Sequence, residues 1–142
     1  MNRDPYSRYH ETKVLGADQG RLILLAYDGI IKFLQIAIDN LENKDYLGKG
    51  RNIIKAQDLI NELLCALNFE AGEIAINLRN IYLFMINRLT YAETNKDMKS
   101  IRDVLKMLYE LQKAWENIIL NTKDERTIVN KQQDITEREA VL

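Results

Sequence analysis

Apolar residues recur at alternating steps of three and four along four stretches of the chain, which places them on one face of an α-helix. In the first stretch the series begins Ile23, Tyr27, Ile30. The chain has one proline, Pro5, and six glycines, so few residues interrupt long helices. The pattern predicts four helices, over residues 18–41, 51–68, 73–94 and 98–120.

The segments between these helices are short and carry turn residues. Gly48 and Gly50 indicate a turn over residues 43–50, Gly72 closes a brief link before the third helix, and Asp97 is placed to cap the fourth. Short links make successive helices antiparallel neighbours. The expected fold is therefore all-α, an antiparallel up-down four-helix bundle.

The two ends of the chain differ from the bundle. Residues 1–17 are mostly polar and form a short N-terminal arm, so the predicted domain spans residues 1–120. Residues 121–142 are rich in charges and amides, which indicates either a frayed helical extension or a flexible, disordered tail. Inside the bundle, the large aromatic side chains are expected to be mostly buried: Tyr27, Tyr82 and Trp115.

Composition and charge narrow the class of protein. Hydrophobic residues make up 46% of the 142 residues, enough for a substantial core. The net charge is −1 with both signs interspersed, and the absence of a Lys/Arg block argues against nucleic-acid binding. The sequence contains no 18-residue apolar window and no apolar leader, so we expect neither membrane insertion nor a signal peptide.

The sequence offers little for catalysis or metal binding. The single histidine, His10, lies in the polar arm, and the single cysteine, Cys65, lies mid-helix, where we expect it to be buried or half-buried. A bundle metal site needs paired Glu-x-x-His motifs, and none is present. We therefore expect no enzyme activity and no cofactor or metal, and the lone cysteine is compatible with a reducing compartment.

Several apolar residues lie beside the row of apolar residues that forms the main buried face of each predicted helix. Ile76 and Leu83 lie seven residues apart on one face of the third helix, and Leu105 and Tyr109 lie four apart on the fourth. Leu59 stands beside the series of the second helix. These residues either widen the core or form a groove that accepts an amphipathic helix of a partner.

The N-terminal arm carries two aromatic residues, Tyr6 and Tyr9, at a spacing that puts both rings on one face of a helical turn. Tyrosine combines a large apolar body with a polar tip, which suits docking on a surface that is sometimes solvated. The alternative is a disordered terminus with incidental tyrosines.

Five pieces in order resemble the FliS family of flagellar chaperones. They are the Tyr6…Tyr9 leader, the LILLAYDGI run at 22–30, the KAQDLINEL run at 55–63, GEIAINLRNIYLFM at 72–85, and Ala114-Trp115. The third-helix piece is the most specific. The chain departs from the family pattern in having Asp18-Gln19 where Ser-Pro is common, and in its unusually long tail after the fourth helix.

The resemblance implies a cytosolic chaperone that wraps the disordered C-terminal segment of flagellin around its bundle. Such a chaperone prevents premature polymerisation and delivers flagellin to the flagellar type III export gate, with the N-terminal arm acting as a cap. A generic helical adaptor or oligomerisation module is the alternative, and we expect a monomer or weak homodimer. The residues predicted to bind the partner are Tyr6, Tyr9, Leu59, Ile76, Leu83, Leu105 and Tyr109.

Overall fold

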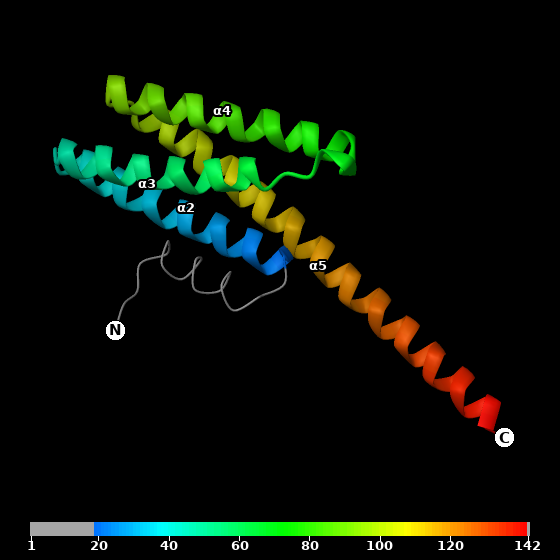
Figure 1. Ribbon diagram of the computed structural model, residues 1–142. Helices are drawn as coiled ribbons and strands as arrows, with labels where there is room; N and C mark the ends of the chain where they lie inside the picture. Colours follow the sequence, from blue (N-terminus) through cyan, green and yellow to red (C-terminus); the bar gives the residue numbers. More distant parts are fainter. Residues whose placement is uncertain (1–18, 142) are drawn as a thin grey trace.

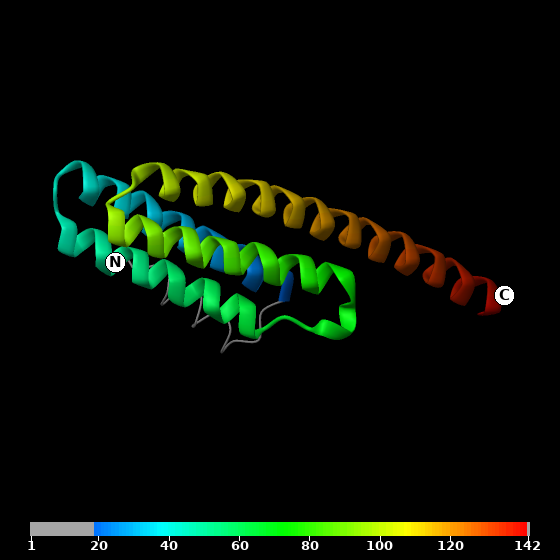
Figure 2. The same cartoon turned by 90° about the horizontal axis from the view of Figure 1, so that it is seen from above.

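A computed structural model describes the backbone of residues 19–141 and the side chains of residues 19–120. Within this part the chain forms four α-helices, one short 3-10 helix and no strand. The elements are α2 (Gln19–Glu42), α3 (Tyr46–Cys65), η1 (Phe69–Ala71), α4 (Glu73–Asn95) and α5 (Met98–Val141). The expected all-α bundle is confirmed: α5 packs against α2 and α4 and continues past the other helices (Figures 1 and 2).

Each helix of the bundle packs against two neighbours. α2 contacts α3 and α5, and α4 contacts the same two helices. The apolar series of all four helices meets in one core, which takes in most of the apolar residues of α2. Tyr27 and Tyr82 are buried there, as predicted, while Trp115 is partly buried and packs against the core from α5. No helix in the described part is both long and apolar enough to cross a membrane.

The prediction of a turn over residues 43–50 is wrong, because α3 begins at Tyr46 and includes both glycines. The Asp45 carboxylate caps the helix by accepting a hydrogen bond from the backbone N–H of Gly48 at 3.0 Å. A Cβ atom at Gly50 would lie 2.9 Å from the carboxylate of Glu93 on α4. The glycines therefore permit close contacts along the first turns of α3 rather than breaking the helix.

Two helices also end at residues other than those predicted. α3 ends at Cys65, before the predicted end at residue 68, because Asn68 instead caps η1 by accepting from the N–H of Glu70. α5 continues for 44 residues to Val141, well past the predicted end at residue 120. No glycine or proline follows Gly72 in the sequence, so no residue of these types stops the last helix.

Candidate protein-binding surfaces

One candidate surface is the outer face of α4, defined by Ile76, Leu83, Phe84 and Tyr91. Ile76 is 44% exposed and Leu83 is 42% exposed, and the other two side chains are half exposed. Helical geometry places all four on the side of α4 that faces away from the buried residues Tyr82, Met85 and Leu89. The predicted pair Ile76 and Leu83 thus shares one exposed face, on which the apolar side chains alternate with polar Asn80 and Asn87.

A second candidate surface lies where α5 meets α2. The Gln35 side chain of α2 donates a hydrogen bond of 2.9 Å to the Tyr109 hydroxyl of α5. Tyr109 is half exposed, whereas Leu105 is buried one turn before it and forms the floor of a shallow hollow. Arg102, Lys106 and Glu110 surround this hollow, so its rim is charged. The structure therefore places Tyr109 and Leu105 together, on a different side of the bundle from the outer face of α4.

Leu59 widens the core, so its prediction as a partner-binding residue is wrong. Its side chain is 0% exposed and belongs to the core cluster. α3 packs against both α2 and α4, so it buries a wider arc than one apolar series covers. Leu59 is part of that wider arc and cannot touch a partner while the bundle is closed.

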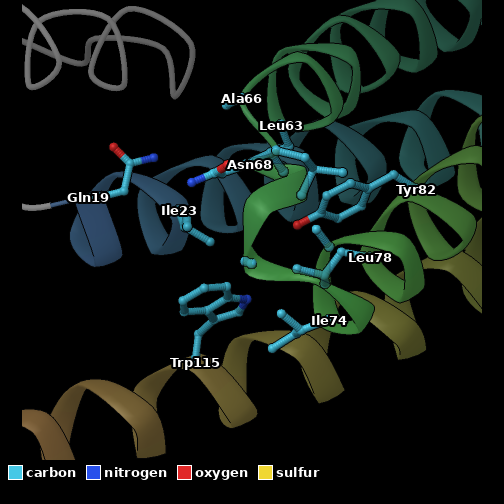
Figure 3. Close-up of a pocket in the computed structure, with 12 residues that line it drawn as sticks. Gln19, Ile23, Leu63, Ala66, Asn68, Ile74, Leu78, Tyr82 and Trp115 are labelled. Carbon is cyan, nitrogen blue, oxygen red and sulfur yellow. The ribbon is translucent and has the colours of Figure 1, made fainter.

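A third feature is a cavity of about 190 Å³ at the end of the bundle where α2 begins and α3 ends (Figure 3). Its walls come from α2, α3, α4, α5 and the η1 link, and they are mainly apolar. Ile23, Leu63 and Leu78 supply aliphatic walls, and the rings of Tyr82 and Trp115 face the same space.

Beside this cavity, polar tips from three helices meet. The hydroxyls of Tyr27 and Tyr82 are 2.7 Å apart, and the Trp115 indole also hydrogen-bonds Tyr27. Burial raises the pKa of Tyr27, and its hydrogen bonds with Tyr82 and Trp115 only partly offset that increase. Burial and the nearby Tyr27 raise the pKa of Tyr82 strongly, so both phenols stay neutral across physiological pH.

Other candidate residues have different outcomes. Tyr6, Tyr9 and His10 lie outside the described residues. Cys65 is exposed, which contradicts the expectation that it is buried or half-buried, because it lies at the outer side of the last turn of α3. Among the described side chains, no group of three or more His, Cys, Asp or Glu residues is close enough together to hold a metal ion.

Three features were not predicted from the sequence: Phe84, Tyr91 and the cavity. Phe84 and Tyr91 lie seven apart, the same spacing that identified Ile76 and Leu83, so the same periodicity argument applied to them. The cavity has no comparable signal, because its lining residues come from five separate segments.

A helical bundle with apolar side chains exposed on separate faces is typical of small protein-binding modules. The family model described as "Flagellar protein FliS" matches residues 1–122, so the chain belongs to the FliS family. This is a family of chaperones rather than of enzymes. The match ends within α5, and the last part of that helix lies beyond it.

Curated relatives agree with the family match. A flagellar secretion chaperone FliS of Bacillus subtilis is 32% identical over 124 residues, which covers 87% of this chain and 92% of the relative. The corresponding protein of Salmonella typhimurium is 36% identical over 110 residues, 76% of this chain and 82% of the relative. A flagellar secretion chaperone FliSB of Pseudomonas aeruginosa is 36% identical over 109 residues, 76% and 86% of the two chains.

Proposed function

We propose that this chain is a cytosolic chaperone that binds the disordered C-terminal segment of flagellin and delivers it to the flagellar type III export apparatus. The observation that carries the proposal is the exposure of apolar side chains on separate faces of a bundle whose core is already complete. The curated relatives, named flagellar secretion chaperones, support the choice of client. A protein that needed these side chains only for folding would gain nothing from exposing them.

The arrangement favours a client that wraps around the bundle. The outer face of α4 and the Tyr109 surface between α2 and α5 lie on different sides, so one segment reaches both only by bending around the protein. Short amphipathic helices joined by linkers suit this path. Ordering a disordered segment costs free energy, which limits affinity and allows release at the export gate. While bound, the segment is unable to polymerise.

The exposed face of α4 provides the direct test. Leu83→Glu puts a charge on an already exposed position, so we expect normal folding but at least tenfold weaker binding of a synthetic cognate flagellin C-terminal peptide, measured by calorimetry. Leu47→Glu is the matched control, because Leu47 is also exposed but lies on α3, outside the proposed surfaces. Equal affinities for the two variants would remove the outer face of α4 from the binding site.

A comparison of two peptides distinguishes a flagellin chaperone from the alternative, a generic helical adaptor. A flagellin chaperone binds its cognate segment much more tightly than an unrelated amphipathic helix of similar hydrophobicity. An adaptor without flagellin specificity binds both peptides alike, and that result would refute the proposed function.

The arm residues Tyr6 and Tyr9 belong to the same proposal. They are proposed to cover an apolar surface in the free protein and to contact the client once it is bound. Two tyrosines bring large apolar area to an interface, so we expect the Tyr6→Ala/Tyr9→Ala double variant to bind the flagellin peptide more weakly. Unchanged affinity and enthalpy in calorimetry would show that the arm takes no part.

A further inference from the structure

The cavity at the end of the bundle has a size and a lining that match one bulky side chain. Its volume is about 190 Å³, and an apolar protein cavity of roughly 150 Å³ is known to accept a benzene ring. Aliphatic side chains and two aromatic rings make up most of its wall. Two side-chain amides, those of Gln19 and Asn68, also line the cavity and lie near one another (Figure 3).

The two hydroxyls and the indole beside the cavity carry one donor hydrogen more than they use in hydrogen bonds to one another. Tyr27, Tyr82 and Trp115 each carry one donor hydrogen. One hydrogen joins the two phenols, and the indole hydrogen is directed to Tyr27. Whichever phenol donates in the pair, one hydroxyl hydrogen remains without an acceptor inside this cluster of described residues.

The position of the two phenols decides where that hydrogen goes. Tyr27 is fully buried and does not line the cavity, so a spare hydrogen there would be buried without a partner, at a cost in free energy. Tyr82 does line the cavity. Donation from Tyr27 to Tyr82 therefore leaves the Tyr82 hydrogen directed toward the cavity, where an acceptor can satisfy it.

We propose that this cavity is a specificity pocket for one bulky apolar residue of the client, whose neighbouring backbone carbonyl accepts a hydrogen bond from Tyr82. An apolar body next to a hydrogen-bond acceptor is what a leucine, methionine or phenylalanine residue in a peptide presents. The inference rests on the proposed function, since the occupant is a residue of the flagellin C-terminal segment.

Variants at the rim test the pocket in the full chain with the synthetic flagellin C-terminal peptide. Ala71→Phe fills the opening from an exposed position, and we expect at least tenfold weaker binding by calorimetry. Ala114→Phe makes the same change at an exposed position of α5 that does not line the cavity, and we expect its affinity to stay within twofold of the unmodified chain. Tyr82→Phe removes only the hydroxyl, and we expect roughly three- to tenfold weaker binding.

Tryptophan emission gives an independent readout, because Trp115 is the single tryptophan of the chain and lines the cavity. Peptide binding should shift its emission in the unmodified chain and in Tyr82→Phe, where the ring still lines the pocket. The shift should disappear in Ala71→Phe.

Two results would overturn the inference while leaving the proposed function intact. The first is tight peptide binding with no change in emission and equal affinities for Ala71→Phe and Ala114→Phe. The second concerns Val14 and Leu15, an apolar pair in the N-terminal arm: a change of Trp115 emission in a Val14→Ala/Leu15→Ala variant without peptide, combined with no change when peptide binds the unmodified chain, would assign the cavity to the chain's own N-terminal segment. Absence of any binding to the unmodified chain would instead refute the proposed function and the pocket with it.

Discussion

Replacing Lys49 by methionine is expected to lower the free energy of unfolding by about 2 kcal/mol, because Lys49 joins the start of α3 to the end of α4. Its side chain is only 2% exposed, and Nζ donates a hydrogen bond of 3.0 Å to the backbone carbonyl of Glu93. A hydrogen bond from a charged donor contributes roughly 1.5–3 kcal/mol. Methionine keeps the unbranched stem and fills most of the volume, so the loss reports the polar contacts rather than a cavity.

The Glu93 side chain contributes less than its carbonyl does. Its Oε2 lies 3.2 Å from Lys49 Nζ without hydrogen-bond geometry, and the side chain is 42% exposed, so solvent screens the ion pair. We therefore expect Glu93→Gln to cost well under 1 kcal/mol, since it leaves the backbone carbonyl in place.

Urea unfolding followed by circular dichroism measures both changes, with Lys113→Met as the control for losing an exposed lysine. The control should stay within about 0.5 kcal/mol of the unmodified chain. A loss below about 0.5 kcal/mol for Lys49→Met, or a gain, would mean that desolvation of the ammonium group cancels its contacts and that the lysine does not hold α3 against α4.

Two further predictions concern other parts of the bundle. Leu59→Ala should cost about 2–5 kcal/mol in the same assay because the side chain is fully buried, whereas Leu47→Ala at an exposed position should change stability by less than about 0.5 kcal/mol. The Ser100 hydroxyl holds the pKa of Asp97 below its usual value, so this stabilisation is present above the unfolded-state pKa of about 3.9 and is lost as pH falls through the lower folded pKa. Ser100→Ala should therefore reduce the loss of stability between pH 4 and more acidic conditions; an unchanged acid-unfolding profile would contradict this account.

Helix existence could be predicted from the sequence because it depends on local periodicity. The third predicted helix, residues 73–94, nearly coincides with α4, Glu73–Asn95. The role of individual glycines could not be predicted. Gly72 adopts a positive φ of 79° in an open link, whereas Gly48 and Gly50 lie inside a helix against neighbouring side chains. Gly48 lies against Asp45 and Asn40 of the preceding segment, whereas Gly50 lies against Glu93 of α4, which is distant in sequence and approaches only in the folded bundle.

For the candidate site too, relations within one helix could be predicted, whereas burial that depends on neighbouring helices could not. A seven-residue spacing was enough to place Ile76 and Leu83 on one face, since that relation holds within one helix, but it left open whether that face is exposed. The burial of Leu59 depends on how many neighbours α3 has, which no local pattern records. Leu105 is likewise buried beside a half-exposed Tyr109, because α2 lies against that side of α5.

The length of α5 has a consequence for how the protein moves in solution. At 1.5 Å per residue its 44 residues span about 66 Å, whereas the 23 residues of α4 span about 35 Å. A particle with such a projecting rod has more friction than a sphere of the same mass, so a single chain will elute early from a gel-filtration column. A monomer judged by its elution volume alone would then be mistaken for a dimer. Light scattering or sedimentation equilibrium is the measurement that gives the number of subunits.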